Sequence, residues 1–587
     1  MLRWVVPGCW MPFVWCLSGA VAAAPVDDWP RYGNNLDNHR FSALDQIDRD
    51  NVDELQLAWR FETGRKATFQ SSPIVVDGVM YLTTPYNDII ALDAASGDPL
   101  WRYRHDLKRR KTCCGPANRG PAVDQRHVYS VTIDARLVAL DRATGQRVWD
   151  VPLEVPEVGD GEQLSAVFGI SELDGAVQTG QSGYSANMAP QVFDGKVFAG
   201  ITGTGYGLHM EVDEGGERRL SVGGISGGHG LRGFIAAFDA ANGRELWRWY
   251  SVPEEGWEGV LRETTAAGDA LNRNIRRERA DLGRFAGSWR YGGGSIWTTP
   301  AIDAGRGLLF LGTGNPSPQM DDTTRPGDNL YTVSLVALDV HTGELRWHFQ
   351  QVPHDRWGYD VASPPVLFDV VDKGRRVPAV AQASKTGWVY VHDRRNGRLI
   401  RRSAPLVEHH NLFQPPTEDG IRIVPGAIGA VSWSPTALDP ATQTLFVAGI
   451  HQASDYFRRE LEPTAGRPWG SFSFFKATDE PDWGTLSAVA LDSGELRWQR
   501  RMQRPMVGGV LATAGGLIFT GEGTGRFGAY DTDGGDLLWF FDSPYGVNAP
   551  PISYRVGGRQ FVAVAAGGNR LFGYPTGDEL LVFALPE

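Results

Sequence analysis

A short segment that ends on a tryptophan recurs along the chain. The copies Ala91–Trp101 and Ala139–Trp149 both pass from Ala-Leu-Asp through a glycine to the tryptophan. An apolar run that ends at an aspartate, a glycine in the turn and a new apolar run predict two strands joined by a tight turn. A degenerate copy, Val391–Ile400, lacks the tryptophan. Further copies end at Trp247, Trp347, Trp498 and Trp539.

A second hairpin signal precedes each copy. In Ser72–Leu82 and Ala189–Phe198 an Asp-Gly pair separates two apolar runs, as in tight β-hairpins. Related segments start near positions 121, 300, 364, 435, 509 and 550. Eight such pairs of hairpins predict an all-β, eight-bladed β-propeller in which the tryptophans dock blade against blade. Leu55–Phe61, which contains Trp59, is expected to close the ring by pairing with the last unit.

The N-terminal segment differs in composition from the rest of the chain. Arg3 is followed by an apolar run from Trp4 to Ala24, and Ala20-Val21-Ala22 has the small-residue spacing of a signal-peptide cleavage site. We expect residues 1–22 to be a signal peptide and residues 23–587 to form one propeller domain, periplasmic or secreted. An uncleaved membrane anchor is the alternative. The formal charge of -12 argues against nucleic-acid binding, because little would neutralise phosphates.

Only two cysteines would remain after cleavage, and they are adjacent. Cys9 and Cys16 lie in the leader segment, whereas Cys113 and Cys114 follow the first copy of the repeat. In an oxidising compartment the pair is expected to form a disulfide between neighbours, with two free thiols as the alternative. Such a disulfide would offer a rigid, flat sulfur surface to a ligand.

Three further motifs accompany the repeat. Asn118-Arg119-Gly120 follows the cysteine pair, Gly312-Thr-Gly-Asn315-Pro precedes Arg325-Pro-Gly-Asp-Asn329, and Pro353-His-Asp-Arg-Trp357 comes later. With the repeat, these motifs resemble the quinoprotein alcohol dehydrogenases, the group that includes methanol dehydrogenase. The resemblance covers nearly all of the chain after the leader. It implies that an alcohol, polyol or sugar hydroxyl is oxidised to a carbonyl by hydride transfer to pyrroloquinoline quinone (PQQ).

The resemblance also assigns cofactor-binding residues. In that family PQQ lies flat between a disulfide of neighbouring cysteines, matched by Cys113 and Cys114, and a tryptophan, matched by Trp297. Arg119 matches an arginine that is suited to bind a cofactor carboxylate, and Lys385 matches a cationic position near the reactive carbonyls. Further contacts are expected from Gln70, Thr202, Gly203, Ser295, Ser432 and Trp433.

The resemblance implies a metal ion as well, either Ca²⁺ or a lanthanide, held by the quinone and by Glu, Asn and Asp side chains. Asn315 matches the asparagine ligand. Gly205 and Gly358 stand where the family has the glutamate and the catalytic aspartate. Asp360 follows closely, at a place where lanthanide-using relatives carry an additional ligand. We therefore predict Asp360 as the catalytic base, as a metal ligand, or as both.

The missing carboxylates leave other arrangements open. Either the ion is bound weakly, or the ammonium group of Lys385 replaces part of its charge. His354 and Asp355 are nearby alternative ligands. A replacement ligand is also conceivable from the insertion after Gly205, which contains His209, Glu211, Asp213, Glu214 and His229.

Partners and alternative functions follow from the same motifs. The sequence has no Cys-x-x-Cys-His motif, so we expect no covalent haem in this chain and a separate soluble electron acceptor, such as a c-type cytochrome. The insertions 206–232 and 455–483 are expected to shape a pocket for a substrate larger than methanol. A non-catalytic scaffold, or a carbohydrate-binding propeller with a degenerate cofactor site, is the alternative function.

Overall fold

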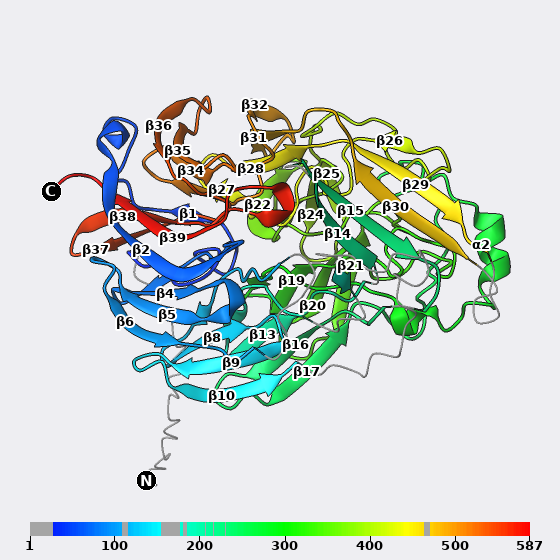
Figure 1. Cartoon of the computed structure of the whole chain (residues 1–587), viewed down its shortest axis with the longest axis horizontal. Helices are drawn as coiled ribbons and strands as arrows, with labels where there is room; N and C mark the ends of the chain where they lie inside the picture. Colours follow the sequence, from blue (N-terminus) through cyan, green and yellow to red (C-terminus); the bar gives the residue numbers. More distant parts are fainter. Residues whose placement is uncertain are drawn as a thin grey trace, which may run out of the picture.

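The regular secondary structure of the computed structural model consists almost entirely of β-strands, which are arranged around a central axis (Figure 1). The predicted signal peptide and the cysteine pair lie outside the residues it describes. No helix in the described part is both long and apolar enough to cross a bilayer. The structure describes residues 27–107, 115–153, 177–179, 185–205, 207–214, 217–228, 230–462 and 470–587.

Eight sheets of the described chain share one antiparallel pattern, in which each strand pairs with the next. The first four sheets are β3 (Ile74–Val76), β4 (Val79–Thr83), β5 (Ile89–Asp93) and β6 (Pro99–Tyr103); β7 (Ala122–Val123), β8 (His127–Val131), β9 (Arg136–Asp141) and β10 (Arg147–Pro152); β12 (Gln191–Phe193), β13 (Lys196–Gly200), β16 (Phe234–Asp239) and β17 (Glu245–Tyr250); and β18 (Ala301–Asp303), β19 (Leu308–Gly312), β20 (Ser334–Asp339) and β21 (Leu345–Gln350).

The remaining four sheets continue the pattern to the C-terminus. They are β22 (Val366–Asp372), β23 (Arg375–Ala383), β24 (Val389–Asp393) and β25 (Leu399–Arg402); β27 (Ala437–Asp439), β28 (Thr444–His451), β31 (Trp483–Ala490) and β32 (Leu496–Met502); β33 (Val510–Thr513), β34 (Leu517–Gly521), β35 (Arg526–Asp531) and β36 (Leu537–Asp542), with β1 (Phe41–Ser42) added in parallel to β33; and β37 (Ile552–Val556), β38 (Arg559–Ala566), β39 (Gly577–Ala584) and β2 (Gln56–Ala67).

The last sheet joins the two ends of the chain. β2 pairs antiparallel with β39, with Trp59 opposite Val582, and the two strands lie side by side in Figure 1. This confirms the prediction that the segment around Trp59 completes the last unit. Because β2 and β39 share backbone hydrogen bonds, the C-terminal strand β39 is not left as an open edge.

The hydrophobic core lies between neighbouring sheets. The second strands are buried along most of their length, as in β8 and β34, whereas the outer strands β6 and β36 are largely exposed. Val131 of β8 and Val197 of β13 belong to one buried cluster, and Phe198 of β13 packs in another with Leu309 of β19. Each sheet is therefore stabilised by packing on both faces.

The repeated tryptophans connect consecutive sheets. Trp101 Nε1 donates to the carbonyl of Arg142 in the next sheet at 3.1 Å, and its ring lies so close to Gly145 that a Cβ there would be 2.5 Å away. The turn glycine thus allows both a positive φ and the ring contact. The same glycine contact joins Trp59 to Gly97, Trp149 to Gly243, Trp247 to Gly343, Trp347 to Gly397 and Trp498 to Gly535.

Replacing Trp101 with alanine is expected to lower the free energy of unfolding by about 3 kcal/mol, because the ring contact and the hydrogen bond between sheets are both lost. Urea denaturation followed by circular dichroism measures the change. Leu100→Ala, one residue earlier in β6 and 53% exposed, is the matched control. Equal losses for the two variants would contradict a role for the tryptophan between sheets.

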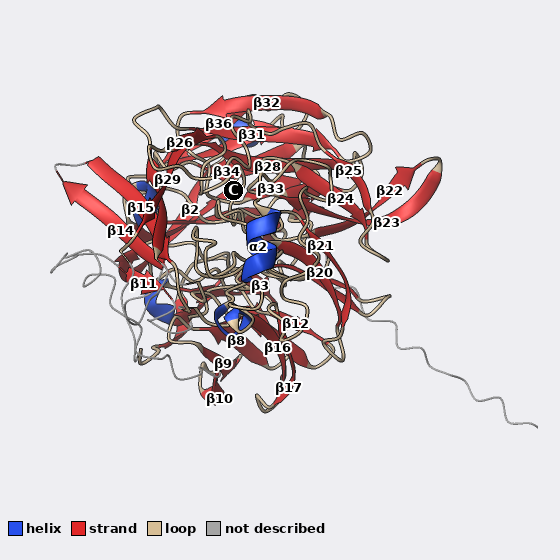
Figure 2. Ribbon diagram, turned by 90° about the vertical axis from the view of Figure 1, so that its right-hand side faces the viewer, coloured by secondary structure: helices blue, strands red, loops and turns tan. Residues whose placement is uncertain are grey.

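A six-stranded sheet outside the repeat is formed by the insertions. Its strands pair in the order β11, β14, β15, β30, β29 and β26. β14 and β15 form a hairpin that projects to the left in Figure 2, and β15 joins β30 with Val222 opposite Phe475. The strands are β11 (Val177–Thr179), β14 (Gly207–Glu214), β15 (Glu217–Ile225), β26 (Ile421–Ile423), β29 (Ser454–Glu460) and β30 (Ser471–Ala477).

Helical segments are short and lie in loops. Asn274 caps the single described α-helix by accepting a hydrogen bond from the amide of Arg277. The helical segments are α2 (Ile275–Asp281), η1 (Val52–Glu54), η2 (Pro85–Asn87), η3 (Ser288–Tyr291) and η4 (Arg570–Phe572).

Candidate functional site

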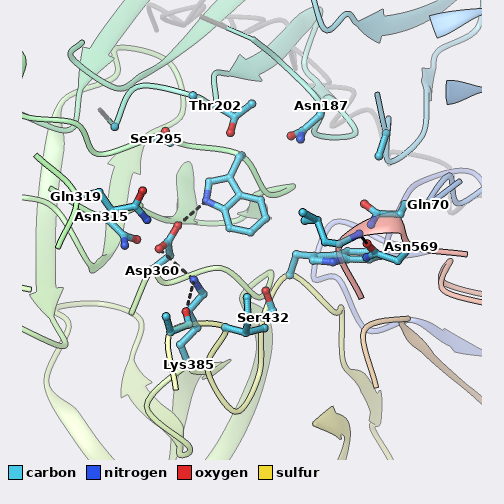
Figure 3. Close-up of a pocket in the computed structure, with 18 of the residues that line it drawn as sticks. Gln70, Asn187, Thr202, Ser295, Asn315, Gln319, Asp360, Lys385, Ser432 and Asn569 are labelled. Atoms are coloured by element: carbon cyan, nitrogen blue, oxygen red, sulfur yellow. Dashed lines mark hydrogen bonds and ion pairs between the residues drawn. The ribbon is translucent and has the colours of Figure 1, made fainter. Parts of the chain in front are cut away.

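One pocket brings together all the predicted cofactor and metal residues that the structure describes (Figure 3). Asn315 and Gln319 lie together on one side of Asp360, and Gln70 and Asn569 lie across the pocket from them. The predicted residues in the lining are Gln70, Arg119, Thr202, Gly203, Ser295, Trp297, Asn315, Asp360, Lys385, Ser432 and Trp433. Cys113 and Cys114 lie outside the described residues, so their predicted disulfide is not placed.

The repeat itself explains why these residues meet. Gln70 precedes β3, Arg119 precedes β7, and Trp297 precedes β18, so each comes just before the first strand of a sheet. Asn315 follows β19, and Lys385 follows β23, so these come just after the second strand. In an antiparallel hairpin the start of the first strand and the end of the second lie at the same end. All of these residues therefore face one mouth of the ring.

Arg119 is a buried cation in the pocket. Its Nη1 donates to Asn187 Oδ1 at 2.7 Å and to the carbonyl of Trp297 at 3.3 Å, while Nε has no hydrogen-bond partner. The guanidinium lies 4.8 Å from the Trp297 ring centroid and 5.0 Å from that of Trp433. Burial lowers the pKa of Arg119 to about 10. No carboxylate in the described part of the chain pairs with it, so the site favours an anionic ligand.

Asp360 is the one carboxylate among the described residues that line the pocket. Its Oδ1 lies 3.2 Å from Lys385 Nζ, and its Oδ2 accepts a hydrogen bond from Trp297 Nε1 at 3.2 Å. Figure 3 shows the carboxylate and the ammonium group pointing toward each other. The two side chains are 14% and 11% exposed, so the ion pair is shielded from most of the solvent. Both oxygens of Asp360 are thus fixed in place.

The two glycines at the expected carboxylate positions face neutral side chains. A Cβ at Gly358 would lie 2.9 Å from Cε of Met320 and 3.4 Å from Nδ2 of Asn315. Gly358 also has a φ of +91°, which a residue with a side chain rarely adopts. Gly205 is more open, since a Cβ there would meet Gln319 Oε1 at 3.9 Å. Gln319 and Met320 therefore occupy the surroundings in which the resemblance predicts anionic ligands.

The donors in the described part of the pocket do not fit a metal ion. Among the residues with described side chains, no three or more His, Cys, Asp and Glu groups gather in a way that could hold one. Asn315 has both amide atoms buried without a hydrogen-bond partner, so it is available to a ligand. Ca²⁺ requires roughly 6–8 oxygen ligands, and one amide and one ion-paired carboxylate supply too few.

Two of the alternative metal ligands, His354 and Asp355, do not line the pocket. His354 bonds through Nδ1 with the carbonyl of Gly327 at 2.7 Å, and its Nε2 lies 3.2 Å from Asp322, in a buried network beside the pocket. Asp355 turns back to accept the amide of Trp357 at 3.1 Å, and burial raises the pKa of Asp355 to about 6. The side chains of His209, Glu211, Asp213, Glu214 and His229 lie outside the described part of the structure.

Several lining residues were not predicted from the sequence. Asn187 accepts a hydrogen bond from Arg119. Asn569 caps the start of η4, because its side chain accepts a hydrogen bond from the amide of Leu571 at 3.1 Å. Asn569 lies between β38 and β39, inside the last unit of the repeat, which has no tryptophan of its own to mark its loops. Phe475 comes from the insertion that was expected to shape the pocket. The apolar part of the lining consists of Met320, Ile428, Phe475, Leu571 and Phe572.

Comparison with known sequences finds relatives that match nearly the whole chain. The model of the PQQ family of glucose, ethanol and alcohol dehydrogenase β-propeller domains matches residues 29–203, 221–405 and 400–562. A quinohemoprotein alcohol dehydrogenase of Comamonas testosteroni is 32% identical over 94% of this chain and 74% of its own length. A quinoprotein ethanol dehydrogenase of Pseudomonas aeruginosa is 32% identical over 92% of this chain and 85% of its own.

Comparison with solved structures finds the same fold in two dehydrogenases. A europium-containing methanol dehydrogenase superposes with a TM-score of 0.76 and 26% identity, covering 96% of this chain and 98% of that one. The quinohemoprotein alcohol dehydrogenase of Comamonas testosteroni superposes with a TM-score of 0.75 and 29% identity, covering 96% and 82%. The all-β propeller-type fold is therefore shared over nearly the whole described chain.

Proposed function

The chain belongs to the PQQ-dependent family of glucose, ethanol and alcohol dehydrogenases, and on that premise we propose that it oxidises an alcohol to a carbonyl compound. The observation that carries the proposal is the buried Arg119, which lacks a carboxylate partner in the described structure. PQQ is multiply anionic and planar. Its negative charge can pair with the Arg119 guanidinium, and its flat face can stack on an aromatic ring.

The residues around Arg119 fit the quinone. When bound, PQQ supplies the two-electron acceptor for a hydride from the alcohol carbon. Trp297 offers an indole ring in the lining of the pocket, and Asn315 offers buried amide atoms without partners. Gln70, Thr202 and Ser295 add neutral polar groups around the edge of the pocket. In this proposal Gly203, Ser432 and Trp433 also contact the cofactor, and the pair Cys113 and Cys114 covers its other face.

Asp360 is the proposed catalytic base. It lines the pocket, and its two oxygens are oriented by Trp297 and Lys385. In this role a carboxylate oxygen of Asp360 takes the proton from the substrate hydroxyl as the hydride leaves the carbon. Asn315 and Asp360 are also the two predicted ligands for Ca²⁺ or a lanthanide. The described donors do not complete a coordination shell, so no step of this mechanism uses an ion.

The substrate is proposed to be an alcohol with a hydrocarbon chain larger than methanol. The apolar residues of the lining, including Phe475 and Phe572, favour burial of such a chain. Sugars and polyols expose hydroxyl groups along their length, and these apolar side chains offer them no hydrogen-bond partners. A panel of alcohols, polyols and sugars therefore tests the substrate class directly.

Export and domain organisation complete the proposal. We propose that residues 1–22 are a cleaved signal peptide and that residues 23–587 form one eight-bladed propeller with docked tryptophans. The protein then acts in the periplasm or outside the cell and passes electrons to a soluble acceptor, for example a c-type cytochrome. N-terminal sequencing of the exported protein tests the cleavage: a mature chain beginning at Ala23 is expected, and an intact N-terminus contradicts it.

Reconstitution tests the function. The purified mature chain is titrated with PQQ, and binding is followed by quenching of tryptophan fluorescence, with EDTA, Ca²⁺ or La³⁺ present in parallel. Dye reduction is then measured with methanol, longer alcohols, glycerol and glucose. Saturable binding and alcohol-dependent dye reduction are expected. Absence of binding under all three conditions contradicts the enzyme and leaves a non-catalytic scaffold or a carbohydrate-binding propeller.

Replacing Phe475 with alanine is expected to change the substrate preference. Phe475 is 3% exposed and its ring lines the pocket, so its removal should enlarge the pocket and favour a bulkier alcohol over ethanol by roughly 10-fold in kcat/KM. The ratio of the two kcat/KM values in one preparation is independent of the active fraction. Phe474→Ala, on the same strand but outside the pocket lining, is the control. An unchanged ratio for Phe475→Ala contradicts its role.

A further inference from the structure

A side-chain cation in the pocket already lies beside Gly358, one of the positions where the resemblance predicts an anionic ligand. Lys385 Nζ lies 3.2 Å from Asp360 Oδ1 and donates to the carbonyl of Gly358 at 2.8 Å. Gly358 is the position at which the resemblance predicts a carboxylate. The ammonium group is thus bound to the backbone of one expected anionic position and to the carboxylate that remains.

The surroundings of the ammonium group also lack the negative charge that an ion requires. Gln319 lies beside Gly205 and Met320 lies beside Gly358, so both missing carboxylates are replaced by neutral groups. Asp360 balances one positive charge, and Lys385 already provides it. A divalent or trivalent ion would add its charge next to a buried cation without a further carboxylate among the described residues.

We propose that Lys385 takes the place of the metal ion, so that this chain binds PQQ without a metal. The inference rests on the proposed function, because it concerns the same cofactor. Lys385 and Arg119 are the two described cations that line the pocket, and Asp360 neutralises one of them. One net positive charge therefore remains to bind the anionic quinone, in addition to the hydrogen bonds that the ammonium group donates.

The position of the Lys385 side chain supports this role, in addition to its charge. Lys385 follows β23, and Gly429 packs against the start of its side chain, where a Cβ would lie 2.3 Å from Lys385 Cβ. The amide of Ala430 donates to the Lys385 carbonyl at 2.9 Å. The side chain is thus confined, and its ammonium group is held in the pocket rather than in solvent.

The first test measures PQQ binding to the wild-type protein after exhaustive treatment with EDTA. The same titration by tryptophan fluorescence is repeated with added Ca²⁺ or La³⁺, and the protein is analysed for bound metal by mass spectrometry. The proposal predicts dissociation constants that agree within about 2-fold under all three conditions, and no stoichiometric metal. A dissociation constant lowered more than about 10-fold by either ion overturns it.

The second test changes the charge of the side chain. Lys385→Met keeps the length of the side chain and removes the ammonium group, so PQQ binding in EDTA is expected to weaken by about 10- to 100-fold. Lys385→Arg retains the charge and is expected to bind PQQ within about 5-fold of wild type. Lys373→Met, an exposed turn residue, is the control for the substitution itself. Equal binding by Lys385→Met and wild type overturns the proposal.

The outcomes separate this inference from the proposed function. Binding that requires an ion contradicts the replacement by Lys385 but keeps the PQQ-dependent enzyme. No binding with or without ions contradicts both. Because the wild-type titration needs no variant, a folding defect in Lys385→Met does not prevent a decision.

Discussion

Replacing Arg119 with methionine is expected to weaken PQQ binding by at least about 100-fold while leaving the free protein as stable as wild type or more stable. The guanidinium is buried, its Nε has no partner, and no described carboxylate balances it. Its burial therefore costs free energy in the absence of cofactor, and only the two hydrogen bonds from Nη1 to Asn187 and Trp297 offset that cost. An apolar side chain of similar length removes the desolvation cost at the expense of these two hydrogen bonds. Fluorescence titration gives the affinity, and urea denaturation without PQQ gives the stability.

Arg40 provides a matched control with the opposite expectation. Its guanidinium is equally buried, but all of its nitrogens donate to neighbouring groups, including the carbonyls of Tyr32, Val510 and Pro551. Arg40→Met leaves these acceptors unpaired and is expected to lower the free energy of unfolding by about 3 kcal/mol. If Arg119→Met destabilises the free protein as much as Arg40→Met does, Arg119 is a structural residue and the argument for an anionic cofactor fails.

Replacing Asp360 with asparagine is expected to lower kcat by roughly 100- to 10,000-fold, because the amide is not a base at neutral pH. The affinity for PQQ should stay within about 5-fold, since the negative charge is removed from a pocket that binds an anion. Steady-state dye reduction gives kcat, and fluorescence titration gives the affinity for PQQ. The two readouts separate a lost base from a lost binding site.

Asp269→Asn is the control for this substitution. Asp269 also forms an ion pair, with Arg402 at 2.6 Å, but it does not line the pocket. Its replacement is expected to leave kcat within about 2-fold of wild type. A value of kcat for Asp360→Asn within about 3-fold of wild type would assign the proton transfer to another group.

The repeat sheets were predictable because their signals are local. Each turn glycine and the tryptophan that follows it lie within one hairpin, so they are recognisable in a short stretch of sequence. The contact between Trp101 and Gly145 of the next sheet then recurs at the equivalent positions of other sheets. The pairing of the Trp59 strand with the last unit was also predicted, because that unit has no tryptophan of its own. The six-stranded sheet was not predicted, since β15 and β30 are far apart in sequence and carry no repeat.

Only the site residues that lie in recognisable sequence motifs could be predicted. Arg119, Trp297 and Asn315 lie in recognisable segments, and all three line the pocket. Gln319 and Met320 lie in no such motif, and their importance depends on the space left by Gly205 and Gly358. His354 and Asp355 are close to Asp360 in sequence, but neither lines the pocket, because their side chains form hydrogen bonds with other groups.

Titration of the purified mature chain with PQQ in EDTA is the most direct test of the central claim, because it asks whether this pocket binds the quinone with its own residues. The expected result is saturable one-to-one quenching of tryptophan fluorescence that is lost in Arg119→Met, followed by alcohol-dependent dye reduction. Absence of saturable quenching, with EDTA, Ca²⁺ and La³⁺ alike, would contradict the account.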